Sequence, residues 1–220
     1  MMQTEIAVLR FGLGARPGDL PAAAHDPRAW LTAQLKGALQ LAGSTPLAPS
    51  EQIFTELLAA REQRQEMRRE AAASSAANPA DKFNPVRDAY LPHYRAQVLA
   101  RAQSASLTTR PFAERLVHFW TNHFAVSADK AADFGVAGTL ENEAIRPHVN
   151  GRFVDLLTAV EQHPAMIGFL DNQYSVGTDS ELAQRAARPG RERILRTRRG
   201  ANSASTKIWR AKFSNCTPWA

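Results

Sequence analysis

The apolar residues of the chain recur mainly at the spacing of an α-helix. In the segment 151–162 they follow the i, i+3, i+4, i+7 pattern that aligns side chains along one helix face. No segment alternates apolar and polar residues as a half-buried strand does. We therefore predict an all-α fold, arranged as an irregular multi-helix bundle. Comparable spacing predicts further helices over 4–11, 26–39, 50–70, 86–105, 109–124, 138–148 and 165–170.

Polar residues and prolines mark where several of these helices begin. Asp26 precedes Pro27, a pair typical of an N-cap followed by proline in the first turn. Ser50 and Thr109 are placed to cap the helices that follow them. The apolar residues of 109–124 surround much of their helix, so we expect this helix to lie deep in the fold.

Two polar stretches follow the first apolar face of the segment 50–70. Residues 61–70 are almost wholly charged or Gln, which is typical of a helix surface in contact with water. Residues 71–79 are rich in Ala, Ser and Asn, and we predict a linker there.

A glycine-rich segment occupies residues 12–18. Glycine-rich loops that bind phosphate follow a strand and lead into the N-terminus of a helix. Here the preceding residues have a helical pattern and Pro17 interrupts the following ones. We therefore predict a plain turn.

Length and composition are those of an ordinary globular protein. The chain has 220 residues, of which 44% are hydrophobic, enough for one sizeable core. It contains no run of about eighteen apolar residues and no secretory signal pattern at its start, so we predict no membrane span and, by default, a cytoplasmic location. The single cysteine, Cys216, excludes a disulfide within one chain and a cysteine-based zinc cluster.

The net positive charge of the chain comes from its C-terminal part. The net charge of +6 would favour contact with nucleic acid. However, ten basic residues and one acid lie between Arg185 and Ala220, whereas 17 basic and 20 acidic residues before Arg185 give a net charge of −3. Because basic charge alone supplies only nonspecific, salt-sensitive affinity, we predict no specific nucleic-acid partner.

The densest group of polar and aromatic residues lies at 118–124. His118 and Asn122 share a helix face, whereas His118 and His123 are about 140° apart around the axis, which disfavours a shared metal ion. Two histidine ligands on one helix would be expected at i and i+4. A second polar set is placed to meet this face across a helix interface: Glu141, Glu143, Arg146, His148, Arg152 and Asp155.

These residues admit a structural and a catalytic interpretation. Buried His and Asn on an apolar helix belong more often to a satisfied hydrogen-bond network than to a catalytic centre. The alternative is an enzyme in which His118, Asn122, His123 and Glu143 converge on one pocket. The sequence indicates no metal and no nucleotide or organic cofactor, so cofactors, substrate and protein partners stay unknown.

Several motifs occur in a fixed order along the chain: Arg10-Phe-Gly-Leu-Gly-Ala-Arg-Pro-Gly18, then 114–127, 145–148, 151–157, 163–166 and 170–172. Together they resemble the bacterial domain of unknown function 1800 family over about residues 6–191. The resemblance implies a mostly helical domain over 1–191 and relatives that are often exported, but no known activity. A helical interaction module in the cell envelope is therefore a further alternative.

The resemblance ends before the C-terminal tail. Members of the family continue into a helix of the form Gly-Leu-Asn-Glu-(Asn or Asp)-x-Ala-Arg-Glu-x-x-Glu-Leu-His-Thr-Leu-Gly, with which residues 203–220 share almost nothing. We chose codons for these residues and shifted the reading frame, so that each new codon takes the last base of one codon and the first two bases of the next. The shifted frame encodes Gly-Leu-Asn-Glu-Asp-Leu-Ala-Arg-Glu-Ile-Leu-Glu-Leu-His-Thr-Leu-Gly. Only the third base of each codon could be chosen among synonymous codons. The first two bases are essentially fixed by the amino acids, such as Lys207, Trp209 and Cys216.

We therefore predict that 192–220 is an out-of-frame, disordered basic tail on a truncated domain. The frameshift would lie between Asp179 and Ser203. Because the tail would replace an amphipathic helix, we also expect exposed apolar faces on the rest of the domain.

Overall fold

The structure is a computed structural model that describes residues 2–74, 84–129 and 133–172, together with 175, 177, 180 and 181. These residues form helices, turns and loops and contain no strand, which confirms the predicted all-α class. The predicted tail 192–220 lies outside the described residues. The helices are α1 (Met2–Glu5), the π-helical turn η1 (Ile6–Arg10), α2 (Asp19–Ala23), α3 (Pro27–Ala33), α4 (Ser50–Ser74), α5 (Pro85–Leu107), α6 (Pro111–His123), the π-helical turn η3 (Glu141–Ile145), α7 (Arg146–His148), α8 (Phe153–Gln162) and α9 (Pro164–Phe169).

The chain divides into two units, Met1–Met166 and Ile167–Ala220. The first unit holds α1 to α8 and all the sites considered below. In the second unit, Asp171 has a φ of 57° shortly after α9. A left-handed residue at this position is typical of a helix end.

The start of α3 agrees with the sequence pattern, but its end does not. The carboxylate of Asp26 accepts a hydrogen bond of 2.9 Å from the backbone N–H of Ala29, as the predicted N-cap requires. The helix then stops well before Leu39. Arg110 donates four hydrogen bonds to backbone carbonyls within 34–38, so these groups are satisfied without a helix.

Residues 12–18 follow the helical turn η1 rather than a strand. Gly14 and Gly18 have φ values of 111° and 92°, which side-chain-bearing residues rarely adopt. A Cβ added at Gly12 would collide with the backbone oxygen of Val8. Backbone geometry therefore accounts for these glycines.

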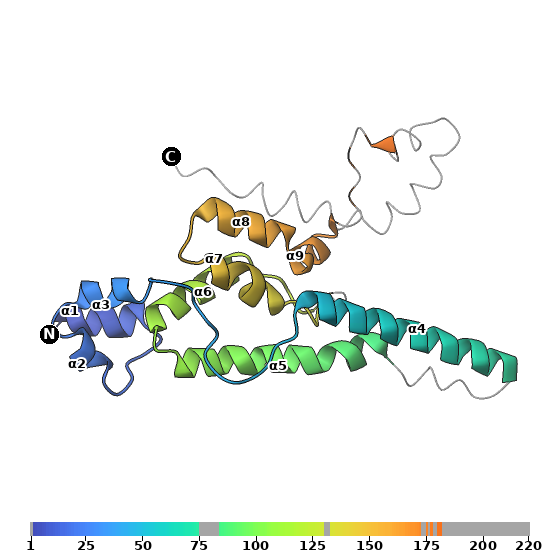
Figure 1. Ribbon diagram of the computed structural model, residues 1–220, viewed down its shortest axis with the longest axis horizontal. Helices are drawn as coiled ribbons and strands as arrows, with labels where there is room; N and C mark the ends of the chain where they lie inside the picture. The colour runs from blue at the N-terminus through green and yellow to red at the C-terminus, as the bar shows by residue number, and fades with distance from the viewer. Residues whose placement is uncertain are drawn as a thin grey trace. The chain divides into compact units, whose positions relative to one another are not determined.

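The long helices α4 and α5 pack side by side as an antiparallel pair (Figure 1). Ile53 and Leu57 of α4 and Tyr90 of α5 are buried in this part of the core. Leu58, the residue after Leu57, is 58% exposed. The helix α4 also continues to Ser74, into the segment predicted as a linker.

A glutamine of α5 fixes the segment that leads into η3. Gln97 donates a hydrogen bond of 2.9 Å to the Gly135 carbonyl and accepts one of 3.1 Å from the Gly138 N–H. The segment lies so close to α5 that a Cβ on Gly135 would overlap the Tyr90 ring. This attachment places η3 against α6 and α8.

The helix α6 is less deeply buried than its apolar pattern predicted. Ala113, Glu114 and Val117 are buried, but the Phe119 side chain is 57% exposed. The apolar residues around α6 therefore divide between the core and the protein surface.

The helix starts predicted at Thr109 and Ser50 differ from the N-caps that the sequence suggested. The helix α6 begins at Pro111 after Arg110, which makes no side-chain cap, so the cap predicted at Thr109 is wrong. Ser50 does begin α4, but its N–H and hydroxyl both donate to Glu143. The Ser50 side chain thus connects α4 to η3.

None of the described helices has both the length and the apolar character needed to cross a lipid bilayer.

Candidate functional site

A buried ion-pair cluster lies between α6, η3 and α7. Both oxygens of Glu114 accept from Arg146, at 2.6 Å and 2.9 Å. A third hydrogen bond, of 3.0 Å, joins Arg146 to Oε1 of Glu141. The Glu114 side chain is 0% exposed and the other two are 4% exposed. One guanidinium therefore holds together two carboxylates from different helical segments.

Arg101 of α5 completes the cluster from its outer side. Its Nε lies 3.3 Å from Oε2 of Glu141, and the Thr121 hydroxyl lies 3.2 Å from the same oxygen. Two carboxylates thus face two guanidinium groups, and the cluster is balanced in charge. Such balance is what allows ionised groups to stay buried.

The surroundings favour the ionised form of both main partners. Burial would raise the pKa of Glu114, but the hydrogen bonds and charge of Arg146, together with Ser104 and His118, hold it below its usual value. Burial would likewise lower the pKa of Arg146, yet Glu114 and Glu141 raise it. Glu114 and Arg146 are therefore both charged at neutral pH.

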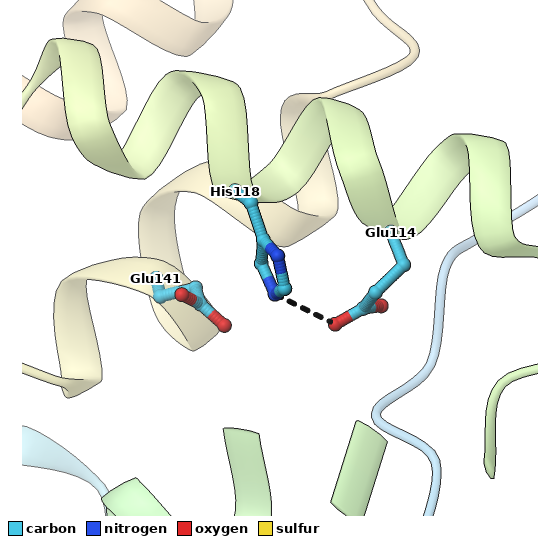
Figure 2. Close-up of side chains that lie close together, drawn as sticks. All are labelled: Glu114, His118 and Glu141. Atoms are coloured by element: carbon cyan, nitrogen blue, oxygen red, sulfur yellow. Dashed lines mark ion pairs between the residues drawn. The ribbon is translucent and has the colours of Figure 1, made fainter. Parts of the chain in front are cut away.

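His118 lies beside the cluster with its imidazole directed toward Glu114 (Figure 2). Its Nε2 is 3.8 Å from Oε1 of Glu114 and has no hydrogen-bond partner among the described residues. Burial and the charge of Arg101 lower the pKa of His118, against the opposing effect of Glu141 and Glu114. The imidazole is therefore neutral at pH 7.

Glu114, His118 and Glu141 are the group whose donor atoms come nearest to a metal site, within 4.8 Å of one another. Carboxylate and imidazole are suitable ligands for zinc and related ions. However, each carboxylate oxygen of Glu114 and Glu141 already faces a guanidinium nitrogen of Arg146 or Arg101. A divalent cation would have to displace these positive groups, so the cluster fits a structural role better.

A cavity of about 260 Å³ adjoins the exposed side of the cluster. It lies between α5, α6 and residues 124–128 and 137–142. Arg101, Thr121 and Glu141 contribute to its wall, as does Asn122 from the last turn of α6. The remaining wall is mostly apolar. It comes from Tyr94, Val98, Phe124, Ala125, Val126, Ala128, Ala137, Gly138 and Leu140, together with the polar residues Gln97 and Asn142.

The structure does not bring the four predicted site residues together. His118 lies beside the buried cluster, and Asn122 lines the cavity. His123 is exposed and packs against Trp120 and Phe124, with ring centroids 5.5 Å and 4.8 Å away. The fourth residue, Glu143, belongs to a separate hydrogen-bond network.

Glu143 joins three parts of the first unit. Its carboxylate accepts from the N–H and hydroxyl of Ser50, both at 2.7 Å, and lies 3.0 Å from Nε2 of His163. Because Nδ1 of His163 accepts from the Ala165 N–H, its Nε2 carries a proton and donates to Glu143. The network ties η3 to the start of α4 and the end of α8.

Replacing Glu143 by Gln is expected to make stability less dependent on acid pH. Burial would raise the pKa of Glu143, but the bonds from His163 and Ser50 lower it below 4.5. A lowered carboxyl pKa stabilises the fold above the unfolded-state value, and this contribution is lost as pH falls through the folded-state value. Urea denaturation should therefore show a deficit of about 1–2 kcal/mol for E143Q at pH 7 that narrows below about pH 4.

The control for this prediction is Glu161→Gln, on an exposed position of α8. It should change the free energy of unfolding by no more than about 0.5 kcal/mol at either pH. A deficit for E143Q that stayed constant from pH 7 to pH 3 would contradict the role given to the Glu143 carboxylate.

Sequence reasoning missed two members of the cluster. Glu114 lies in the first turn of α6, where an acidic residue is already favourable for the helix dipole. The sequence therefore gave no separate reason to expect its ion pair with Arg146. Its spacing of four residues from His118 was the available signal. Arg101 gave no signal, because nothing in the spacing of α5 indicates which arginine meets Glu141.

An aromatic face extends across the surface of α6 and α8. We define it by Phe119, Trp120, His123 and Phe124 together with Phe153. The Trp120 ring lies 5.0 Å from Phe119, 5.7 Å from Phe124 and 5.6 Å from Phe153. Phe119 is 57% exposed and Phe153 is 54% exposed. Two helices therefore present one continuous group of aromatic rings to solvent.

The fold and site define an all-α protein with a charge-balanced Glu–Arg cluster at its centre. The chain belongs to the family described as "Protein of unknown function (DUF1800)", which matches residues 6–192. This confirms the resemblance predicted over about 6–191. No curated protein and no solved structure matches the chain.

Proposed function

We propose that this protein is a helical interaction module whose aromatic face binds one side of an amphipathic helix. The exposure of Phe119 and Phe153, on two helices joined through Trp120, carries the proposal. Isolated apolar side chains on a surface are ordinary, but contiguous aromatic groups are typical of contact sites. Grooves between helices bind amphipathic helices through anchors at helical spacing.

The occupant that we propose is the helix encoded by the shifted frame of the tail. Its second, sixth, tenth, thirteenth and sixteenth residues are Leu, Leu, Ile, Leu and Leu, which form one apolar stripe. Three of its four acidic residues lie outside that stripe, and the fourth, at its ninth position, lies within it. On this protein, exposed Arg115 lies one turn before Phe119, and exposed Arg152, which pairs with Asp155 at 3.3 Å, directly precedes Phe153. The charges at the edge of the aromatic face therefore suit an acidic helix.

The proposed occupant depends on the reading frame of the C-terminal segment. We propose that 1–191 is the domain and that 192–220 is read out of frame in a bacterial gene. The family match ends at residue 192, within the range 179–203 in which we place the frameshift. In-frame translation would supply the amphipathic helix within the same protein, and the present chain would lack this intramolecular partner.

The nucleotide sequence from Asp171 to beyond Ala220 tests the frame directly. A net loss of one base before Ser203, with the Gly-Leu-Asn-Glu helix in the alternative frame, is the expected result. A tail encoded by codons whose regrouping gives no such helix would contradict the proposal.

A synthetic peptide of the shifted-frame sequence tests the aromatic face. Trp120 lies within the face, so its fluorescence should shift to the blue when the peptide covers it. Phe119→Ser combined with Phe153→Ser should weaken binding about tenfold or more in isothermal titration calorimetry, because both anchors are lost.

Leu58→Ser is the matched control, because Leu58 is equally exposed but lies on α4, outside the aromatic face. It should leave peptide affinity unchanged, and a scrambled peptide should not bind. Equal affinity of the wild type and the double variant would overturn the proposed surface. Absence of peptide binding to the wild type would overturn the proposed occupant.

Catalysis in the His118 region is the less well supported alternative. His118, Asn122, His123 and Glu143 have different surroundings, and of the four only Asn122 lines the cavity. A catalytic group must lie within hydrogen-bond reach of its substrate.

A further inference from the structure

We propose that the cavity between α5, α6 and residues 124–128 and 137–142 binds a small organic carboxylate, with Arg101 as its main contact. This inference does not depend on the aromatic face, although Phe124 belongs to both surfaces. It depends on the donors in the cavity wall, on the apolar remainder of that wall, and on the volume of about 260 Å³.

The guanidinium of Arg101 uses one nitrogen to contact Glu141, and its other N–H groups are available to a ligand. Its Nε faces Glu141 at 3.3 Å, which fixes the orientation of the guanidinium. None of the hydrogen bonds among the described residues uses the Arg101 side chain, which is 42% exposed. A planar guanidinium held at one nitrogen can still present its other N–H groups to a second carboxylate.

The field of Glu141 does not prevent this contact. Glu141 also faces the buried guanidinium of Arg146 at 3.0 Å, so Arg101 is not its only positive neighbour. Asn122 supplies a second donor on the same cavity wall, because its exposed amide makes no hydrogen bond among the described residues. The cavity thus offers two donor side chains that can point toward one anionic group.

The apolar wall selects an organic anion over an inorganic one. Val98, Phe124, Val126 and Leu140 would contact the body of the ligand while its carboxylate faces Arg101. Ligand sites are typically apolar with a few orienting polar groups, and this volume lies just below their usual range of about 300–1,000 Å³. We therefore assign a monocarboxylate with a short branched or cyclic apolar body.

Titration of the full chain with isovalerate tests the assignment. In two-dimensional NMR, the Arg101 Nε–Hε and Asn122 amide signals should shift together and saturate with the same dissociation constant. Isovaleramide, which lacks the charge, and inorganic phosphate, which lacks the apolar body, should each bind at least about tenfold more weakly. Phosphate that shifts the same signals with equal or higher affinity would overturn the assignment to an organic carboxylate.

Variants then identify the contact. Arg101→Met should weaken isovalerate binding at least about tenfold, whereas Arg95→Met, on an exposed position of α5 outside this cavity, should leave it unchanged. Since Arg101→Met also removes an ion pair with Glu141, Ala125→Phe serves as a second variant that fills the cavity and leaves the ion pair intact. Unchanged affinity in both variants would overturn the proposed site.

The titration of His118 gives an additional readout. The charge of Arg101 helps to lower the pKa of His118, so a carboxylate bound to Arg101 should offset that charge and raise the pKa. An isovalerate-induced rise in the wild type that disappears in Arg101→Met is the expected result. A rise of equal size in Arg101→Met would contradict the contact.

Discussion

Replacement of Arg146 by Met is expected to lower the free energy of unfolding by about 3–5 kcal/mol, a large part of the roughly 5–15 kcal/mol that stabilises a typical domain. Glu114 is 0% exposed and loses both hydrogen bonds to the guanidinium, while Glu141 loses one. Methionine fills a similar volume, so the substitution leaves little empty space. The decrease in the free energy of unfolding therefore measures the effect of leaving two carboxylates without their positive partner. Urea denaturation followed by circular dichroism measures it.

Two comparisons separate the charge effect from general damage. Arg152→Met removes an arginine whose side chain is 78% exposed and should cost about 0.5 kcal/mol or less. Adding Glu114→Gln and Glu141→Gln to Arg146→Met should recover part of the loss, because amides need no counter-charge. No recovery, together with a full loss in Arg146→Met, would show that the cluster acts through packing instead.

The pH dependence of the Arg146→Met variant has a defined sign. Without the arginine, burial becomes the main influence on Glu114 and raises its pKa. A raised carboxyl pKa destabilises the fold at high pH, and the penalty decreases as pH falls and the group takes up a proton. The stability difference between wild type and variant should therefore be smaller at pH 4 than at pH 7.

Replacement of Gly135 by Ala is expected to cost about 1–3 kcal/mol. A Cβ at this position would lie 2.7 Å from Cβ of Tyr90 and closer still to the ring. Tyr90 is fully buried, and the Gly135 carbonyl is held by Gln97, so neither partner can move away without breaking other contacts. The midpoint of urea denaturation should fall while its slope stays constant.

Gly177→Ala is the matched control, because no atom lies within 4 Å of the Cβ that it would add and its φ is not in the left-handed region. It should change stability by less than about 0.5 kcal/mol. Equal effects of the two substitutions would contradict the close packing of the segment before η3 against α5.

The two buried polar networks explain how short helical turns are held in this fold. Glu141 and Glu143 both belong to the π-helical turn η3, yet one faces Arg146 and the other faces Ser50 and His163. Together they attach η3 to α6, α7, the start of α4 and the end of α8. A single turn of helix has little stability of its own, so such side-chain contacts define its position.

The sequence by itself determined the helical class, the cap at Asp26, the family and the confinement of positive charge to the tail. These properties depend on local spacing, local hydrogen bonds or ordered motifs, which need no knowledge of the fold. The early end of α3 was not predictable, because Arg110, far along the chain, satisfies the carbonyls that would have extended the helix.

Only the tertiary structure decided which polar residues meet. Glu114 and Arg146 are separated by 32 residues, and their contact depends on how α6 packs against η3 and α7. Periodicity gives the direction of a side chain around its own helix but not the neighbour that covers it. For the same reason the pattern placed Phe119 on an apolar helix, while the packing of α6 left it exposed.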